Sequence, residues 1–351
     1  MRAPQIGYWN ASREPGAWRR FDSIRVAQAA ERILGVAQRT PLAPFDAGDP
    51  RLELRLKLEN RQSTGAFKAR GAWNQISMLA PESRARGVVC TSSGNHGGAL
   101  AWAAQRAGVP AVIVMPKDAY PNKIAACRER GAEVVLCDDR ASAEAECARR
   151  VEAGATLVHP YDAERTIQGA GTVGMEIAQD WPEVEVVVVP VGGGGLVSGT
   201  ALGARQFLRE EHGDEAAGER LRVLGAEPEG APTLTIGLRT GSTEPLTHIT
   251  SRVQGLTPPN AGRLNVDVCR VALDGTFLLD DETIVEAQGR LVRAGEIVEP
   301  AGAAAFALVI AGGVPEEWLE HRDFRRPLRV CAVVSGGNPD PAQLARLQQS
   351  P

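Results

Sequence analysis

Hydrophobic and polar positions alternate strictly over residues 51–60, RLELRLKLEN. The leucines fall on one face and the charged residues, Lys57 among them, on the other, which predicts a half-buried β-strand. Short apolar runs typical of strands recur at 87–94, 111–116, 133–138, 156–162, 184–191, 222–228 and 329–337. Helical spacing is found at 22–37 and, between these strands, at 98–108, 122–131, 141–154 and 165–180. The repeated strand–helix units predict an α/β fold with right-handed crossovers.

The run at 184–191 is the most apolar of these, as expected for a strand that is buried on both faces of a parallel sheet. Residues 1–20 are rich in Trp, Arg, Pro and Gly, and we expect them to form an irregular N-terminal extension.

Four of the predicted strands end in clusters of Gly, Ser, Asn or Glu. These clusters are SSGNHGG (92–98), GGGGLVSG (192–199), EPEGAP (227–232) and SGGNPD (335–340). Ligands of such sheets bind beyond the carboxyl ends of the strands, so four clusters there indicate one shared crevice.

The four glycines at 192–195 lie between a buried strand and a helix. Such a turn can aim backbone N–H groups and a helix dipole at an anion, and we favour this interpretation over the alternative of a tight structural turn. Within this turn the dinucleotide spacing GxGxxG is absent, and no Gly-Lys pair of a Walker A loop occurs in the chain. The anion therefore belongs to a ligand other than NAD or a nucleoside triphosphate.

Only four lysines occur among the 39 basic residues of the chain, and one of them, Lys68, lies in QSTGAFKARGA. Ser63 and Thr64 are good N-caps, so we expect a helix that holds Lys68 in its first turns. The helix dipole and burial both favour a neutral, nucleophilic amine there; an exposed helix lysine is the alternative. Lys117 and Lys123 flank a loop rich in Pro, Tyr and Asp and are expected at the surface.

The bulk composition narrows the functional classes. The chain has 351 residues, enough for two domains, and a formal net charge of −4 without a basic stripe, which argues against a nucleic-acid partner. It has no apolar run near 18 residues and no signal-peptide core, which argues against a membrane partner. Its six cysteines form no CxxC pair, so we expect a reduced, cytoplasmic protein.

A nucleophilic lysine, a phosphate-binding turn and a neutral hydroxyl at a strand end form a coherent set. Together, STGAFKARGA, SSGNHG, GGGGLVSG, EPAGAAA and SGGN resemble the fold-type-II pyridoxal-phosphate enzymes of the threonine/serine dehydratase and serine racemase branch. The resemblance extends from about residue 39 to residue 340. It implies a tryptophan synthase beta-like fold of two three-layer α/β domains, with pyridoxal 5'-phosphate in the cleft between them. It further implies a homodimer that acts on a small amino acid.

Under this resemblance, Lys68 matches the Schiff-base lysine, Phe67 the residue beside the cofactor ring, Asn95 the partner of the ring hydroxyl and Ser335 the partner of the ring nitrogen. The phosphate cup matches the backbone N–H groups of Gly192, Gly193, Gly194, Gly195 and Leu196. Ser92, Ser93, Asn95 and His96 lie in the loop that takes the substrate carboxylate, and Ser93 also matches the second acid/base of the racemases. Taken alone, His96 is equally typical of a structural residue, and Ser335 of a turn.

The resemblance also implies domain limits of 1–85 with 165–351 for a large cofactor-binding domain and 86–164 for a small mobile one, without a C-terminal regulatory domain. Glu227 and Ala231 match two positions of a racemase-type cation site. Thr233 stands where the acid of that site would be, which argues against a bound Mg²⁺. Segment 247–265 departs from the family pattern and is expected to reshape the substrate entrance or the dimer surface.

The activity implied is a lyase reaction, the β-elimination of a β-hydroxy amino acid such as L-threonine or L-serine to a 2-oxo acid and ammonia. In it, Lys68 removes the α-proton. The alternatives are an amino-acid racemase with Lys68 and Ser93 on opposite faces, a β-hydroxyaspartate- or phenylserine-type dehydratase, a β-replacement enzyme, and a ligand-binding homologue without chemistry.

Overall fold

The apolar strands in the later part of the chain, with three from its beginning, form one large sheet. The structure is a computed structural model that describes residues 1–213 and 216–349. In spatial order the strands are β1 (Gln5–Trp9), β10 (Gly275–Leu279), β9 (Arg222–Pro228), β8 (Val186–Pro190), β11 (Leu328–Val334), β3 (Leu52–Leu58) and β2 (Leu42–Phe45). The edge strands β1 and β2 are antiparallel to their neighbours, and the inner strands are parallel.

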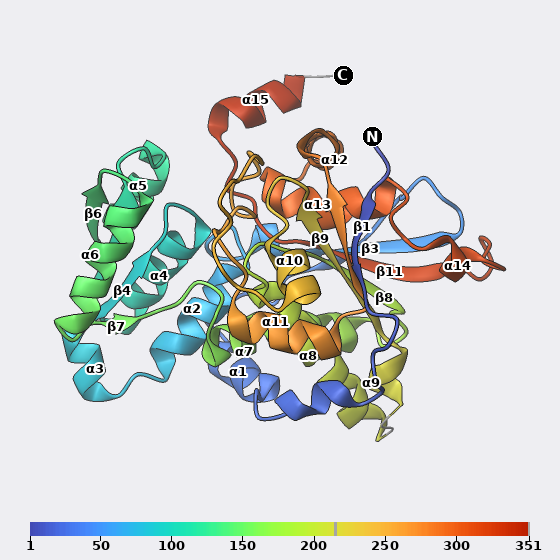
Figure 1. Cartoon of the computed structure of the whole chain (residues 1–351), viewed down its shortest axis with the longest axis horizontal. Helices are drawn as coiled ribbons and strands as arrows, with labels where there is room; N and C mark the ends of the chain where they lie inside the picture. Colours follow the sequence, from blue (N-terminus) through green and yellow to red (C-terminus); the bar gives the residue numbers. More distant parts are fainter. Residues whose placement is uncertain (214–215, 350–351) are drawn as a thin grey trace.

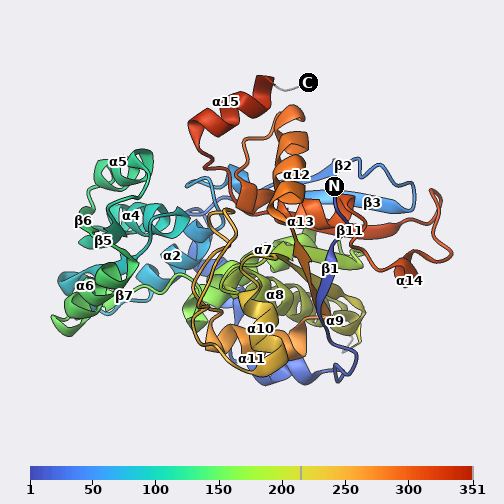
Figure 2. The same cartoon turned by 45° about the horizontal axis from the view of Figure 1, so that its top comes forward.

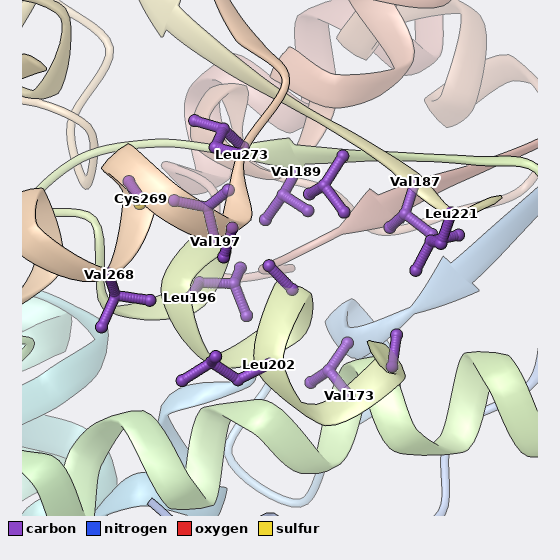
Figure 3. Packing of buried hydrophobic residues seen from close by; sticks show 14 of the residues in the cluster. Val173, Val187, Val189, Leu196, Val197, Leu202, Leu221, Val268, Cys269 and Leu273 are labelled. Atoms are coloured by element: carbon purple, nitrogen blue, oxygen red, sulfur yellow. The ribbon is translucent and has the colours of Figure 1, made fainter. Parts of the chain in front are cut away.

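Helices cover both faces of this sheet, as expected from the apolar residues at 184–191. Val187 and Val189 of β8 pack into the core on one face, and Val186 and Val188 into the core on the other. The first core is closed by α7 (Glu164–Asp180), α8 (Gly195–His212), α10 (Thr233–Thr240) and α11 (Arg263–Ala272), and α1 (Val26–Ile33) packs on α7 and α8. The second is closed by α12 (Asp281–Arg293) and α13 (Pro300–Ile310). Figure 3 shows residues of α8 and α11 interlocking beside β8.

A second, smaller sheet contains four parallel strands. Their order is β6 (Glu133–Cys137), β5 (Ala111–Pro116), β4 (Val88–Thr91) and β7 (Thr156–Leu157). The cores on its two faces contain residues of α2 (Lys68–Ser77), α4 (Asn95–Ala107) and α5 (Pro121–Glu129) on one side and of α6 (Arg140–Glu152) on the other. Figure 1 shows this part beside the large sheet, and the expected pair of α/β domains is confirmed.

The remaining elements are short or peripheral. They are η1 (Ala17–Phe21), η2 (Glu59–Arg61), α3 (Pro81–Arg86), α9 (Ala217–Arg220), α14 (Glu316–Leu319) and α15 (Pro341–Gln349). Helix α15 projects from the body and contacts α12 (Figure 2). None of the helices described is long and apolar enough to cross a membrane.

The expectation of an irregular N-terminal extension is wrong. Strand β1 extends the large sheet at its edge, and Trp18 is fully buried. The Trp18 indole donates to Glu219 at 2.6 Å. Trp18 of this N-terminal segment therefore belongs to the hydrophobic core. The composition of the segment does not reveal the apolar surface against which this ring packs.

Candidate active site

The chain that leads into α2 lies against the end of β11. Phe67 N donates to the Ser335 carbonyl oxygen at 3.1 Å, and Gly337 N donates to the Gly65 carbonyl oxygen at 2.7 Å. The segments QSTGAFK and SGGN, far apart in the sequence, are therefore neighbours in space.

Helix α2 begins at Lys68, with Phe67 at the N-cap position and no side-chain cap. The prediction that Ser63 and Thr64 cap this helix is wrong. The Thr64 hydroxyl instead donates to the Ala66 carbonyl oxygen at 3.3 Å, in a turn that precedes the helix. Lys68 is still at the positive end of the helix dipole, as predicted.

The Lys68 amine reaches into the interior. Nζ donates to the Pro160 carbonyl oxygen at 2.6 Å and lies 4.9 Å from the centre of the Phe67 ring. Burial lowers the pKa of Lys68 to about 8, and the Cys90 thiol acts in the opposite direction. A substantial fraction of this amine is therefore neutral near pH 8, which a nucleophile or a general base requires.

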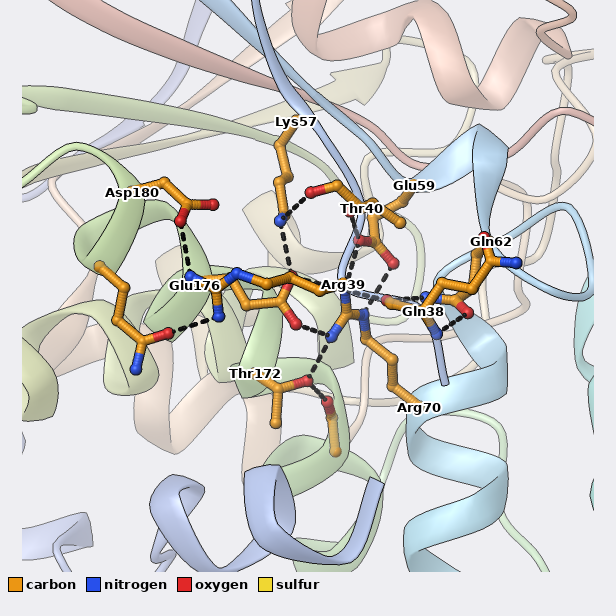
Figure 4. A network of polar contacts seen from close by, with 12 residues as sticks. Gln38, Arg39, Thr40, Lys57, Glu59, Gln62, Arg70, Thr172, Glu176 and Asp180 are labelled. Carbon is orange, nitrogen blue, oxygen red and sulfur yellow. Dashed lines mark hydrogen bonds and ion pairs between the residues drawn. The ribbon is translucent and has the colours of Figure 1, made fainter. Parts of the chain in front are cut away.

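A network of buried charges fixes the helix that carries Lys68 (Figure 4). Two residues further along α2, the buried Arg70 donates to both carboxylate oxygens of Glu59 at 2.8 Å and to Glu176 of α7 at 2.7 Å. The Lys57 amine donates to the other oxygen of Glu176 at 2.6 Å. Burial raises the pKa of Glu59, but the charge and hydrogen bonds of Arg70 outweigh this effect and hold it below its usual value. The network ties the start of α2 to β3 and α7.

Two lysines differ from their predicted environment. Lys57 was expected on a solvated face but is 0% exposed, because α7 covers that face of β3. Lys123 was expected at the surface but is half-buried, and its amine donates to the Asn338 carbonyl oxygen at 2.9 Å. Lys117 is exposed, as predicted, and pairs with Asp138 at 3.0 Å.

The glycine cluster forms the turn from β8 into α8. Gly194 is the N-cap and has a left-handed φ of 92°. A side chain at Gly193 would overlap the Tyr161 ring, since its Cβ would lie 2.4 Å from that ring. Among the described residues, the backbone N–H groups of Gly192 to Leu196 find no acceptor. These groups, at the N-terminus of a helix, are suited to a phosphate.

Tyr161 is a site residue that the sequence analysis missed. Its ring packs on the glycine turn, and its hydroxyl donates to Asn260 at 3.3 Å. It directly follows Pro160, the partner of Lys68, so one loop joins the amine to the glycine turn. The pair Pro160-Tyr161 within the predicted run at 156–162 was the available signal.

Ser335 directly follows β11 of the large sheet, and Asn95 is the first residue of α4 beside the small sheet. Ser335 is 5% exposed, and its hydroxyl donates to the Ala301 carbonyl oxygen at 3.4 Å. The Asn95 amide donates to Glu299 and accepts from Asn338 at 2.8 Å. Burial raises the pKa of Glu299 above its usual value. Glu299, at the N-cap of α13, is a second site residue that the sequence analysis does not predict.

The side chains of the SSGNHG loop differ in their hydrogen bonds and in their exposure. The Ser92 hydroxyl accepts from the backbone N–H groups of Gly94 and Gly97 at 3.2 and 3.1 Å, so it anchors the start of α4. His96 is buried with its Nε2 at 2.8 Å from the Val158 carbonyl oxygen, so the ring nitrogen donates there. Burial and the nearby Lys68 lower the pKa of His96 to about 3, which keeps the ring neutral. Ser93 is exposed in the bend before α4.

A cavity of about 250 Å³ opens between the two domains beside this loop. Gly94, Asn95 and Lys123 line it from the small-sheet side. From the large-sheet side it is lined by residues that include Arg252, Gln254, Gly255, Glu299, Pro300 and Asn338. Three residues of the atypical segment 247–265 therefore line this cavity.

Glu227 and Ala231, the two matched positions of a racemase-type cation site, both accept hydrogen bonds within the protein. Glu227 is fully buried at the end of β9, where burial raises its pKa to about 7 against hydrogen bonds from Thr235 and Leu234 that lower it. Within residues 1–213 and 216–349, no three His, Cys, Asp or Glu side chains are grouped so that they could hold a metal ion.

Comparisons with known proteins agree with this geometry. The family model described as "Pyridoxal-phosphate dependent enzyme" matches residues 33–336. The chain is 37% identical to L-threonine ammonia-lyase of Thermotoga maritima, over 84% of this chain and 69% of that protein. It is 32% identical to phenylserine dehydratase of Ralstonia pickettii, over 93% of this chain and 95% of that protein. The solved structure of maize serine racemase superposes with a TM-score of 0.80 at 34% identity, covering 93% of this chain and 95% of that one.

The features of the site fit the cofactor of this family. Unpaired N–H groups at the glycine turn suit its phosphate, the enclosed Lys68 amine suits its aldehyde, and the buried Ser335 hydroxyl suits its ring nitrogen. The family match covers most of the chain, and the expected resemblance and the cofactor are confirmed. The chain belongs to the pyridoxal-phosphate dependent enzymes, in the branch of the threonine and serine dehydratases and serine racemases.

Proposed function

We propose that the protein is a dehydratase, an ammonia-lyase that converts a β-hydroxy amino acid such as L-threonine or L-serine to a 2-oxo acid and ammonia. The α-proton and the β-hydroxyl leave as water, and water then releases the nitrogen as ammonia, so the net products are the oxo acid and ammonia. The activity of the relative in Thermotoga maritima, named L-threonine ammonia-lyase, supports this reaction class.

The observation that carries the proposal is the Lys68 amine. Its pKa of about 8 is close to neutral pH, which suits a proton acceptor. The Pro160 carbonyl oxygen at 2.6 Å holds the amine in place, and the buried network around Arg70 holds the helix. Lys68 can therefore take the α-proton from a substrate held beside it.

Pyridoxal phosphate, when bound, supplies the electron sink that makes this proton acidic. Ser335 offers the ring a neutral hydroxyl rather than a carboxylate. We infer that a neutral partner limits the spread of charge into the ring and favours loss of the β-hydroxyl. Asn95 and the loop that contains it lie where the substrate carboxylate is expected.

A substrate panel tests the proposal. We expect oxo-acid release from one or more of L-serine, L-threonine, 3-hydroxyaspartate and phenylserine, and its loss in Lys68→Ala. Lys117→Ala is the matched control, because Lys117 is exposed and far from any predicted role. A holoenzyme that binds the cofactor but releases no oxo acid from any member would refute the dehydratase.

A racemase is the second candidate, and Ser93 favours it. Ser92 is occupied by two backbone N–H groups, whereas the Ser93 hydroxyl has no hydrogen bond to any of the residues described. A free hydroxyl could return a proton on the face opposite Lys68. Chiral chromatography that shows inversion without oxo acid, abolished in Ser93→Ala, would assign the racemase.

A further inference from the structure

Glu227 presents a buried carboxylate that the proposed reaction does not use. It lies at the end of β9 with 0% exposure, and an uncompensated charge at such a place is costly. The resemblance places a divalent cation at this position, coordinated by Glu227, by the Ala231 carbonyl oxygen and by an acid where this chain has Thr233.

Every group that could face such a cation is engaged inside the protein. Glu227 Oε1 accepts from Leu234 N at 2.8 Å, and Oε2 accepts from Thr235 N at 2.9 Å and from the Thr235 hydroxyl at 2.5 Å. The Ala231 carbonyl oxygen accepts from Thr233 N at 2.9 Å.

The donors to Glu227 come from the first turn of α10. That end of the helix carries the positive part of its dipole, which stabilises an anion. The Thr235 hydroxyl is itself 2.6 Å from the Thr276 hydroxyl of β10, which completes a chain of hydrogen bonds through the buried site. The one other acid of the EPEGAP turn, Glu229, is exposed and within 3.3 Å of the Arg2 guanidinium.

Thr233 connects this cluster to the cofactor site. Its hydroxyl donates to the Gly192 carbonyl oxygen at 3.1 Å. Gly192 opens the glycine turn whose N–H groups suit the phosphate. Glu227, the start of α10, Thr233 and Gly192 therefore form a continuous connection from β9 to the phosphate cup, which we call the α10 brace.

We propose that the α10 brace replaces a divalent cation in this protein and holds the phosphate cup without any metal. The inference concerns cofactor retention and does not depend on which reaction the site performs. Its readouts, thermal stability and cofactor release, therefore separate its failure from a failure of the proposed function.

The first experiment exposes the holoenzyme to EDTA and then to Mg²⁺, Ca²⁺ or Mn²⁺. We expect the Tm and the rate of cofactor release on dilution to stay unchanged under all four conditions. A saturable rise in Tm with any of these ions, or faster cofactor loss in EDTA, would overturn the proposal.

The second experiment breaks the connection to the cup. Thr233→Val keeps the shape of the side chain and removes the hydroxyl, so we expect cofactor release to become roughly 3- to 10-fold faster, the size of one lost hydrogen bond. Thr233→Ser should restore retention. Thr240→Val is the matched control, because the Thr240 hydroxyl lies at the other end of α10, where it donates to Ile236 at 2.8 Å and accepts from Ser242 N at 3.1 Å. Equal retention by Thr233→Val and wild type would show that the brace does not act on the cup.

The third experiment restores the missing acid. Thr233→Asp places a second carboxylate beside Glu227 and removes the donor to Gly192, so we expect a lower Tm in EDTA that Mg²⁺ or Ca²⁺ raises. A folded Thr233→Asp protein with no response to either ion would refute the equivalence of brace and cation. If this variant fails to fold, the EDTA and Thr233→Val measurements decide the proposal.

Discussion

Lys57 and Lys68 are close in sequence and both point into the protein, but they lie in regions with different electrostatics. Lys57 meets a carboxylate, Glu176 at 2.6 Å, within a network that also holds Arg70 and Glu59. Lys68 meets a carbonyl oxygen, an aromatic ring and a thiol, and burial lowers its pKa to about 8. Burial beside a full counter-charge gives a structural cation, whereas burial without one gives a reactive amine.

The largest effect on turnover is expected at Lys68, whose amine bonds to a carbonyl oxygen rather than to a carboxylate. The replacement Lys68→Ala removes both the cofactor anchor and the base. It should therefore lower the turnover of whichever β-hydroxy amino acid of the panel the wild type converts by roughly 10³-fold or more. The free energy of unfolding should change little, since no buried partner loses its counter-charge. Oxo-acid release and urea denaturation measure the two quantities. A Lys68→Ala enzyme with near-normal turnover would contradict the role of this amine.

At Lys57, whose amine pairs with Glu176, we expect a large effect on stability and a small effect on turnover. Lys57→Met should lower the free energy of unfolding by about 3–5 kcal/mol, because it leaves an excess negative charge buried beside Glu176. The turnover of the molecules that remain folded should fall far less than in Lys68→Ala. Urea denaturation checks this result, and a loss below about 1 kcal/mol would show that the pair is dispensable.

The pKa of Lys68 predicts how apoprotein captures the cofactor. The neutral amine is the reactive form, so the rate should rise roughly tenfold per pH unit below about pH 8 and level off above it. An ordinary lysine would continue to gain past pH 9. Stopped-flow absorbance measures the rate, with N-acetyl-lysine as a control for ionisation of the cofactor itself. A continued rise beyond pH 9 would mean that burial does not act on Lys68 as described.

The smallest effect on stability and turnover is expected at Lys117, which is exposed and pairs with Asp138. Lys117→Ala removes an exposed pair with Asp138 and should change the free energy of unfolding by less than about 0.5 kcal/mol, with turnover unchanged. A larger change in urea denaturation would show that exposed lysines are a poor reference for Lys57 and Lys68.

The sequence predicted those parts of the molecule that depend on local pattern. The order of strands and helices, the buried strand β8, the glycine turn and the position of Lys68 at a helix start all follow from periodicity and turn chemistry. The glycine turn at 192–195 and the cluster around Ser335 follow the neighbouring parallel strands β8 and β11, so both lie at the same edge of the sheet, as expected for this class of sheet.

The parts that could not be predicted depend on what a surface packs against. Alternation assigned Lys57 to solvent, but α7 covers that face of β3, and periodicity cannot reveal a covering helix. Ser63 and Thr64 have the chemistry of N-caps, yet contacts with the end of β11 set the start of α2. Tyr161 and Glu299 join the site through loops from distant segments, so no spacing in the sequence links them to Lys68.

The buried network of Figure 4 also restricts how this sequence can change over evolutionary time. Lys57, Arg70, Glu59 and Glu176 carry two charges of each sign. Any one neutral replacement strands a charge in the interior, while a matched pair of replacements does not. Descendants of this chain are therefore expected to exchange these positions together, so that substitutions at 57, 59, 70 and 176 are correlated across lineages.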